Sequence, residues 1–510
     1  MTLRAKTINL LQEIVGPANV LTDIEDIYVY SFEQIYREQR ILKLDAVVRT
    51  ECPEEIKKVG KLADENGFIV AQRGKAFDLK KISKPIVVLD DFKPLNLEPL
   101  KESEKVSTEA INKFRKTEIG TLKKLAFAQK LMFLNKPTTK CQECDACSSY
   151  CTAASSFNNI ETWSAKGRLL LIKAMSGDEL SVSPKLVDVI YTCSNCGLCF
   201  SECLQHSEFQ EAIRAARRKI VLKDLAPQIF KAAAENILEV GDPGGVVSQK
   251  RRLSWLRTVS KPGSSQASLL YWVGCTVAAR TPNTAKAVIN ILNSAGASFA
   301  LLGEREGCCG YLLLASGLWD EAKKNAIRII ERVRQTGVEL MVTSCAGCYY
   351  TFSRLFPEIL DVEMPCRLLH VSQFLEDLLG EGMLDLKGVE STVTYHDPCS
   401  LGRHSDVYDA PRNVLAKILE LQFVELPLSK SRSRCCGGGG GLWSYNNRVS
   451  LDSASTRLMK DVVPLNVNVL TTACPVCLMN LRYASIRNSI PVKVCDIAEI
   501  VEIAMGKDYS

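Results

Sequence analysis

The sequence contains no run of about 20 apolar residues, so it predicts no membrane-spanning helix, and we expect any link to a membrane to come through a partner. No basic segment followed by an apolar run and a small-residue cleavage site is visible, and the 21 cysteines are an odd number. These observations predict a cytoplasmic, reducing environment rather than a secreted disulfide framework. A basic stripe interleaved with aromatic residues is also missing, which argues against a nucleic-acid partner.

The length of 510 residues allows two to four domains with ample cores. Apolar residues make up 46% and charged residues 24% of the chain, and these ordinary fractions exclude disorder and fibres. We expect an α/β and α multi-domain protein. Its predicted parts are a small α/β domain (1–100), a helical connector (101–140), a helical domain (141–240), a linker (241–266) and two repeated α/β domains (267–385 and 386–510).

Two cysteine runs with the same spacing lie in the helical domain. Residues 141–151 read CQECDACSSYC and residues 193–203 read CSNCGLCFSEC, so both follow C-x2-C-x2-C-x3-C. This is the spacing of cubane [4Fe–4S] ferredoxins, in which the fourth cysteine of each run ligates the other run's cluster. The predicted ligands are Cys141, Cys144, Cys147 and Cys203 for the first cubane, and Cys193, Cys196, Cys199 and Cys151 for the second. A pair of zinc sites is the alternative, but it leaves the third and fourth cysteines of each run without a role.

Helices are predicted between and after these runs. Residues 161–175 form one with an apolar face, and 183–193 form a second that delivers Cys193. This spacing resembles the ferredoxin domain shared by heterodisulfide reductase, fumarate reductase iron–sulfur subunits and the glycolate oxidase iron–sulfur subunit. Ferredoxins usually have proline after the fourth cysteine, where this chain has Thr152 and Leu204.

One long helix is predicted over 207–238, and we expect its basic residues on a solvated face rather than in a docking patch. These residues are Arg214, Arg217, Arg218 and Lys219. In the connector before the first cysteine run, a helix is predicted near 118–133.

The first 100 residues predict a strand at 44–50, a helix from Pro53 to Glu65 and two further strands, FIVAQRG and KPIVVLD. Asn66-Gly67 ends the helix. The stretches VLTDIEDIYVYSF and DAVVRTECPEEIKKVGKLADENGFIVAQRG resemble the start of the flavin-binding domain of glycolate and D-lactate oxidases. In that family a glycine-rich loop follows, but here it reads RGKAFDLKKISK and keeps only Gly74. We therefore expect a truncated domain that does not bind FAD itself, and that either docks a partner or serves as a scaffold.

An internal repeat fills residues 267–505. Each copy reads strand–helix–strand–helix–strand, which predicts parallel pairing. The five cysteines of each copy lie at strand carboxyl ends or in the loops just beyond, where open α/β sheets bind ligands. The two sets are Cys275, Cys308, Cys309, Cys345 and Cys348 in the first copy, and Cys399, Cys435, Cys436, Cys474 and Cys477 in the second.

Five thiolates that include an adjacent pair suit neither tetrahedral zinc nor a simple cubane. The repeated C…CCG…C-x2-C pattern, over residues 137–505, resembles the cysteine-rich CCG domains in the D-type subunits of heterodisulfide reductases. This resemblance implies two Rossmann-like repeats that hold two noncubane [4Fe–4S] clusters, with a disulfide cleaved between them. It makes Cys308, Cys309, Cys435 and Cys436 the expected catalytic cysteines.

Proton delivery is expected from a histidine of the second copy. The family often has histidine directly after the first cysteine of that copy, where this chain has Ser400. We predict His404 as the catalytic substitute, with His396 as another candidate. The alternative for both is a hydrogen-bonded structural histidine.

Several basic residues surround the second copy, and they suit either an anionic substrate or a solvated loop. These residues are Arg403, Arg412, Lys430, Arg432 and Arg434. Three cysteines outside every motif, Cys52, Cys366 and Cys495, are predicted to be buried small hydrophobic residues.

Three functions remain open. The first is a heterodisulfide reductase-like subunit that passes electrons from a redox partner through two cubanes to two noncubane clusters. The second is the electron-transfer subunit of a flavin-dependent D-lactate or glycolate dehydrogenase that delivers electrons to quinone or an electron-transfer flavoprotein. The third is a structural or assembly protein. The first two imply a flavoprotein partner, a small thiol, disulfide or hydroxy-acid substrate and, for the first, a membrane b-type cytochrome.

Overall fold

The computed structural model describes residues 3, 5–34, 44–72, 86–91, 147–148, 150–203, 209–246, 252, 254–255 and 267–506. The chain divides into two compact units: residues 1–149 with 160–186, and residues 150–159 with 187–510. We call them the first and the second unit. Some predictions fall outside the described residues, namely the loop over 73–84, the connector over 101–140 with its helix, Cys141, Cys144, Leu204 and most of the linker.

The first unit contains a sheet in the order β1-β2-β4-β3. Strands β2, β4 and β3 are parallel, and β1 is antiparallel to β2. The bounds are α1 Ala5–Val15, η1 Pro17–Asn19, β1 Val20–Leu21, α2 Ile24–Gln34, β2 Ala46–Thr50, α3 Pro53–Asn66, β3 Ile69–Gln72 and β4 Ile86–Asp91. The predicted helix and its end are confirmed, because α3 begins at Pro53 and Gly67 follows it with a left-handed φ of 72°.

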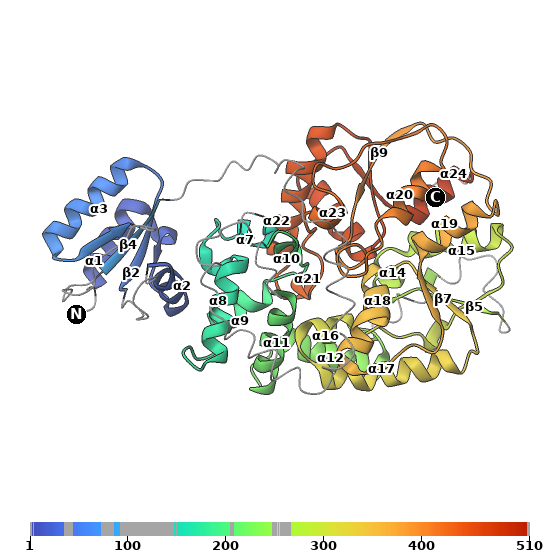
Figure 1. Ribbon diagram of the computed structural model, residues 1–510, viewed down its shortest axis with the longest axis horizontal. Coiled ribbons are helices and arrows are strands. Elements are labelled where there is room, and N and C mark those ends of the chain that lie inside the picture. Colours follow the sequence, from blue (N-terminus) through green and yellow to red (C-terminus); the bar gives the residue numbers. More distant parts are fainter. Residues whose placement is uncertain are drawn as a thin grey trace. The chain divides into compact units, whose positions relative to one another are not determined.

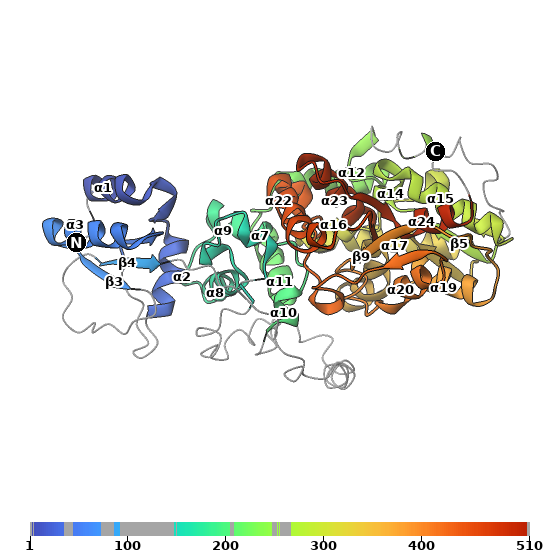
Figure 2. The ribbon, with the colours of Figure 1, turned by 90° about the horizontal axis from the view of Figure 1, so that it is seen from above.

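Helix α2 lies beside the segment that separates the two cysteine runs (Figure 2). This segment contains η4 Glu161–Trp163, α8 Ala165–Ser176 and the start of α9 Pro184–Tyr191. Asp26 accepts a hydrogen bond from Thr162 at 2.5 Å and pairs with Lys185, while Tyr28 donates to Glu179 at 2.7 Å. Burial raises the pKa of Asp26, although Lys185 opposes the shift. Polar contacts thus attach this segment to the α/β part of the first unit.

The second unit contains two parallel four-stranded sheets, one per repeat (Figure 1). Their orders are β6-β5-β7-β8 and β10-β9-β11-β12, so each repeat has the order 2-1-3-4. The strands of the first repeat are β5 Leu269–Trp272, β6 Phe299–Ala300, β7 Leu340–Thr343 and β8 Arg367–His370. Those of the second are β9 Ser391–His396, β10 Leu421–Phe423, β11 Val469–Thr472 and β12 Lys493–Asp496. The predicted parallel pairing is confirmed, and each repeat has a fourth strand that the sequence analysis missed.

Helices fill the rest of the described second unit. Before the repeats lie α7 Thr152–Ser155, α10 Leu198–Ser201, α11 Phe209–Leu222 and α12 Gln228–Val240. The first repeat contains α14 Cys275–Arg280, α15 Pro282–Ser294, η6 Gly303–Arg305, α16 Tyr311–Ser316, α17 Trp319–Arg334, α18 Ala346–Tyr350, η7 Thr351–Leu360 and α19 Val371–Gly380. The second contains α20 Asp409–Ala416, η8 Lys430–Arg432, α21 Leu442–Tyr445, α22 Asn447–Arg457, η9 Leu458–Val462, η10 Val463–Leu465, α23 Pro475–Arg487 and α24 Ile497–Ala504.

The single long helix predicted over 207–238 is wrong. The structure has two helices, α11 and α12, with Pro227 immediately before α12. Proline has no backbone N–H to donate and disfavours helical backbone in the residue before it. These properties separate the two helices.

The two repeats pack against each other through reciprocal contacts. Helix α15 of the first repeat contacts α24 of the second, and α19 of the first contacts α20 of the second. Helices α15 and α20 precede the second strand of their repeats, and α19 and α24 follow the fourth. Thr284 donates to Glu499 at 3.0 Å across this interface. Equivalent elements that exchange places in this way are typical of an approximate two-fold relation.

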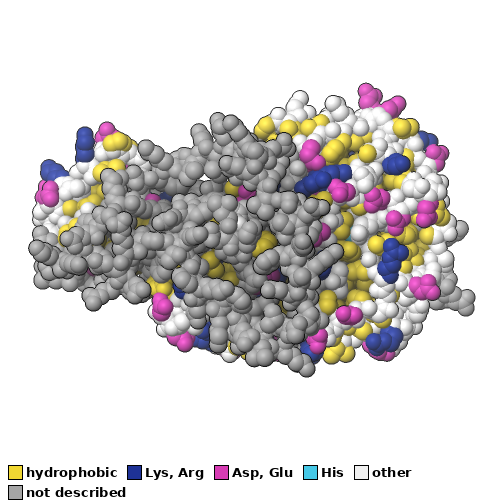
Figure 3. Space-filling view, viewed as in Figure 1, with side chains coloured by type: hydrophobic (Ala, Val, Ile, Leu, Met, Phe, Trp, Pro, Cys, Tyr) yellow, Lys and Arg dark blue, Asp and Glu magenta, His cyan; other side chains and the backbone are white. Residues whose placement is uncertain are grey.

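Acidic and basic side chains are interspersed over the described surface on the face shown in Figure 3. Among the described helices, none combines the length and the apolar composition that crossing a membrane needs.

Candidate metal centre

The strand order brings the cysteines of each repeat to one end of its sheet. Cys275 follows β5 and Cys345 follows β7, the two adjacent central strands of the first repeat. Cys399 and Cys474 follow β9 and β11 in the same way. Crossovers leave adjacent central strands of a 2-1-3-4 sheet in opposite directions, which opens a binding position beyond their carboxyl ends.

The five cysteines of the first repeat lie together. The Sγ atoms of Cys275 and Cys308 are 3.6 Å apart. Cys309 adjoins Cys308 and Cys348, and Cys348 adjoins Cys345. Four of the five are buried and Cys275 is half-buried.

The second repeat reproduces this arrangement. The Sγ atoms of Cys436 and Cys477 are 3.3 Å apart. Cys435 adjoins Cys399 and Cys436, and Cys477 adjoins Cys474. Here Cys399 is half-buried and the other four are buried.

Backbone N–H groups point at the sulfur atoms of both Cys-Cys pairs. Gly310 donates to Cys308 at 3.5 Å, and Gly437 donates to Cys435 at 3.2 Å. Both glycines have left-handed φ values, 84° and 78°, which glycine adopts without strain. In the second repeat the next N–H, that of Gly438, donates to Cys436 at 3.4 Å. Such hydrogen bonds stabilise cluster thiolates.

The donor set fits an iron–sulfur cluster better than a single ion. The hydrogen bond with Cys308, together with burial, raises the pKa of the Cys275 thiol well above its usual range. Crowded buried thiols ionise only when a cationic group compensates the charge of several thiolates at once. Five soft donors exceed the four ligands of tetrahedral zinc.

The two sets meet at one point. The thiols of Cys345 and Cys474 adjoin each other. These cysteines are equivalent in the two repeats, since each follows the third strand. A contact between equivalent residues lies close to the approximate two-fold axis.

The second cysteine run lies against the second repeat. Cys196 adjoins Cys435, and the N–H of Asn195 points at Cys193 Sγ at 3.3 Å. Cys151 precedes α7, which packs against α22 of the second repeat. Cys199 lies within α10 and Cys203 follows that helix.

The ligands predicted for the first cubane are only partly described. Cys147 belongs to the first unit and Cys203 to the second, while Cys141 and Cys144 lie outside the described residues. This set therefore stays a prediction.

Arg217, which was expected on a solvated face, is fully buried. Its Nη2 donates to the carbonyl oxygen of Cys193 at 2.6 Å, and its Nη1 donates to those of Ala315 and Gly440, both at 2.7 Å. One guanidinium therefore joins the second cysteine run to both repeats. Arg214 is also buried and donates to the Tyr350 hydroxyl at 3.0 Å. The expected solvated face is wrong for these two residues.

Most of the basic residues around the second repeat are paired with carboxylates. Arg412 contacts Asp397 and Glu425, Lys430 contacts Asp409, Arg432 contacts Glu202, and Arg434 contacts Asp461. Their charge is therefore largely compensated by the protein itself. Arg403 differs from these four residues, because its fork donates to backbone carbonyls.

The histidines lie close to the cysteines in different ways. His404 stacks on Tyr350 with ring centroids 4.7 Å apart, and its Nε2 lies 3.2 Å from the carbonyl oxygen of Asn195. His396 is buried, and one of its ring nitrogens lies within 4.8 Å of the Cys436 and Cys477 thiols. Ser400 is buried beside Cys399.

His370 went unnoticed in the sequence. It is buried and caps α19, and burial lowers its pKa to about 4.

Of the three remaining cysteines, Cys495 is buried as predicted, whereas Cys52 and Cys366 are only partly buried.

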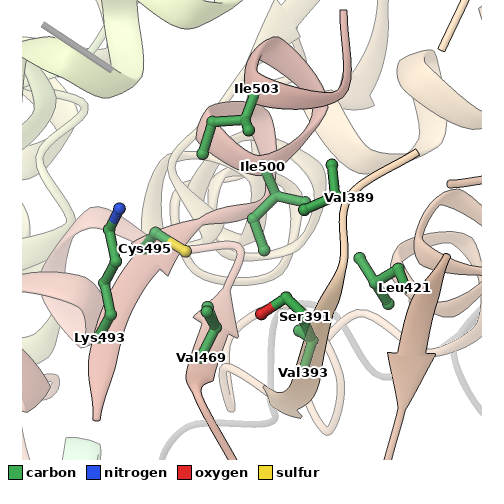
Figure 4. A pocket seen from close by; sticks show the side chains of 9 residues that line it. All are labelled: Val389, Ser391, Val393, Leu421, Val469, Lys493, Cys495, Ile500 and Ile503. Carbon is green, nitrogen blue, oxygen red and sulfur yellow. The ribbon is translucent and has the colours of Figure 1, made fainter. Parts of the chain in front are cut away.

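A small cavity of about 40 Å³ lies at the other end of the second sheet (Figure 4). Its lining includes Ser391, Val469 and Lys493, which begin β9, β11 and β12. Cys399 and Cys474 follow the opposite ends of β9 and β11, so this cavity is separate from the candidate centre.

Comparisons with known proteins agree with the repeat. A family model described as "Cysteine-rich domain" matches residues 269–353 and 393–482. The D-type subunit of the dihydromethanophenazine:CoB–CoM heterodisulfide reductase of Methanosarcina barkeri is 32% identical over 354 residues, which cover 69% of this chain and 85% of the relative.

Two further relatives carry other names. The EtfAB:quinone oxidoreductase of Syntrophomonas wolfei is 30% identical over 62% of this chain and 47% of the relative. The B-type subunit of the fumarate reductase (CoM/CoB) of Methanothermobacter marburgensis is 28% identical over 62% of each chain. The chain is thus an iron–sulfur oxidoreductase subunit, and it belongs to the family formed by the D-type subunits of heterodisulfide reductases.

Proposed function

We propose that this chain carries electrons from a redox partner through two cubane [4Fe–4S] clusters to two noncubane [4Fe–4S] clusters, where a disulfide is reduced or formed. The observation that carries the proposal is the meeting of two complete five-cysteine sets at Cys345 and Cys474. The proposal assigns a ferredoxin fold to the helical domain, Rossmann-like folds to both repeats and a truncated FAD-oxidase-like fold to residues 1–100.

The proposed ligands of the noncubane clusters are the two five-cysteine sets. Cys193, Cys196, Cys199 and Cys151 would hold one cubane, and Cys141, Cys144, Cys147 and Cys203 the other. Bound clusters would supply one-electron chemistry, which side chains alone cannot. Reduction of a disulfide to two thiols consumes two electrons and two protons.

The chain's own residues position these groups and exclude water. The contact between Cys196 and Cys435 supports a short path from the second cysteine run to the second repeat. Arg217 fixes that run against both repeats. His404 and His396 are the proposed proton carriers on the side of the second set, and Cys308, Cys309, Cys435 and Cys436 are the proposed catalytic cysteines.

A thiol titration of the anaerobically purified chain tests this function. We expect added thiol to give a new paramagnetic signal in the oxidised protein, and Cys308→Ser combined with Cys435→Ser to remove it. Cys495→Ser is the matched control, because Cys495 is buried in the second repeat but belongs to neither set. A thiol-dependent signal that persists in the doubly substituted protein would contradict the proposal.

A second candidate is the electron-transfer subunit of a flavin-dependent D-lactate or glycolate dehydrogenase. The parallel strands β2, β3 and β4 of the first unit and the EtfAB:quinone oxidoreductase relative favour it. Purification from the native cell distinguishes the two. A flavoprotein of the hydroxy-acid oxidase type in the complex supports the second candidate, whereas a b-type cytochrome without it supports disulfide chemistry.

A further inference from the structure

Arg403 lies in the turn that follows Cys399 and is 6% exposed. Its Nε donates to the carbonyl oxygen of Cys196 at 2.9 Å. Its Nη1 donates to the carbonyl oxygens of Ser431 at 3.1 Å and Ser433 at 2.5 Å. The guanidinium therefore joins the second cysteine run to the loop that leads into Cys435.

No carboxylate of the described residues lies within ion-pair distance of Arg403. Its Nη2 is buried and finds no hydrogen-bond acceptor among the same residues. A buried cation without a counter-charge is strongly unfavourable. Carbonyl oxygens satisfy N–H groups but carry no full charge, so the site requires an anion nearby.

The groups around Arg403 that bear negative charge once a cluster is bound are cysteines. Arg403 lies four residues after Cys399, its Nε holds the carbonyl oxygen of Cys196, and its Nη1 holds that of Ser433, two residues before Cys435. Two of these cysteines belong to the second five-cysteine set, and Cys196 belongs to the second run. Arg403 thus faces two predicted cluster sites at once.

The first repeat has no cation at the equivalent sequence position. Four residues after Cys275, where Arg403 follows Cys399, the chain has Ala279. Near the first set the described residues include both a buried carboxylate, Asp242, and a buried guanidinium, Arg252, which donates to the carbonyl oxygen of Gly241 at 3.4 Å. The two sets therefore differ in the cation that follows the first cysteine of the second set.

We infer that Arg403 is the counter-ion of the second cysteine set and of the cysteine run beside it, and that it raises the reduction potentials of the clusters held there. The inference rests on the proposed function for placing clusters on these cysteines. Positive charge and hydrogen bonds near a cluster raise its potential, because the reduced form carries one more negative charge. Arg403 acts as a positioning residue.

Potentiometric titration of the anaerobic full-length protein, followed by electron paramagnetic resonance, tests this role. We expect Arg403→Gln to shift the potential of the thiol-dependent signal and of one cubane signal downward. Arg403→Lys should restore most of the shift, because it keeps the charge. Lys430→Gln is the matched control, since Lys430 lies in the same region but pairs with Asp409 in solvent, and it should leave both potentials unchanged.

Unchanged potentials in Arg403→Gln at full iron content would overturn the inference, and so would an equal shift in Lys430→Gln. Where Arg403→Gln loses iron but Arg403→Lys keeps both iron and potential, the charge is again decisive. Loss of iron from both variants would show that only the hydrogen bonds matter, and would overturn the charge role. The cubane potential is measured whether or not the thiol-dependent signal appears, so failure of the proposed reaction remains distinguishable from failure of the counter-ion role.

Discussion

The two repeats share a strand order and a cysteine pattern, but their Cys-Cys loops continue differently. In the first repeat Gly310 leads directly into α16, and Tyr311 begins that helix. In the second repeat five glycines separate Cys436 from α21. Gly440 passes so close to the second cysteine run that an added Cβ would lie 2.2 Å from the carbonyl oxygen of Ser194.

The two loops share one structural role, and only the loop of the second repeat has an additional one. Both loops aim an N–H at a cysteine sulfur, which a common ligand requires. Only the longer loop provides a surface without side chains against which another backbone can pack. The hydroxyl of Tyr311 accepts a hydrogen bond from the N–H of Gly440 at 3.2 Å, so the shorter loop also supports the longer one.

The largest loss of stability is expected from Arg217→Ala, because Arg217 joins the second cysteine run to both repeats. The change leaves buried carbonyl oxygens of both repeats and of the second cysteine run without their donor. We expect the free energy of unfolding to fall by about 5 kcal/mol or more. Anaerobic urea unfolding measures it. Arg218→Ala is the adjacent control and should cost about 1 kcal/mol, because its partner Asp320 is exposed; equal losses in the two variants would contradict the joining role.

A smaller effect is expected from Gly440→Ala, which tests whether the glycine run exists for close approach. The new Cβ would overlap Ser194 and the φ of 62° would be strained, so we expect a loss of about 3 kcal/mol. Gly296→Ala is the control in the first repeat. Its φ is 66° but no atom of the described residues would lie within 4 Å of the new Cβ, so strain alone should cost about 1 kcal/mol. Similar losses would mean that backbone conformation, not packing, selects the glycine.

The smallest expected change in stability comes from a buried titratable residue at the end of a fourth strand. The first repeat has His370 at this position, and the second has Asp496. Burial holds the pKa of His370 at about 4, below its usual 6.5. Below pH 6.5 this histidine is protonated in the unfolded chain but stays neutral in the folded chain. The free energy of unfolding therefore falls as the pH decreases toward 4. Between pH 8 and pH 5 this loss is about 2 kcal/mol.

The variant His370→Asn should remove this part of the pH dependence, as measured by urea unfolding at several pH values. Asparagine can still cap α19. Asp496 responds in the opposite direction, because burial raises its pKa and its cost appears as pH increases. An unchanged pH profile in His370→Asn would show that other groups dominate the acid response.

Much of the second unit could be predicted from sequence because strand ends and cysteines coincide. Strands such as β9 and β11 are apolar runs that end next to a cysteine. Strands β8 and β12 were missed because each starts at an exposed charged residue, Arg367 or Lys493, which interrupts the apolar run. Neither carries a cysteine of the sets, so no motif drew attention to them.

Buried charge was the part that sequence reasoning could not place. Arg217 and Arg218 are neighbours in a run of basic residues, yet one is fully buried and the other pairs with an exposed aspartate. The burial of Arg217 depends on carbonyl groups from residues about 100 to 220 positions later in the chain. Residue type and helical spacing carry no information about such acceptors.

The reciprocal contacts between the repeats bear on the ancestry of the chain. An interface in which equivalent helices exchange places can be closed by two identical molecules. A single-repeat ancestor could therefore have worked as a homodimer, with the residue now duplicated as Cys345 and Cys474 paired across the symmetry axis. Fusion of two such copies would free each to diverge, and Arg403 and Ala279, four residues after the first cysteine of each set, differ in this way.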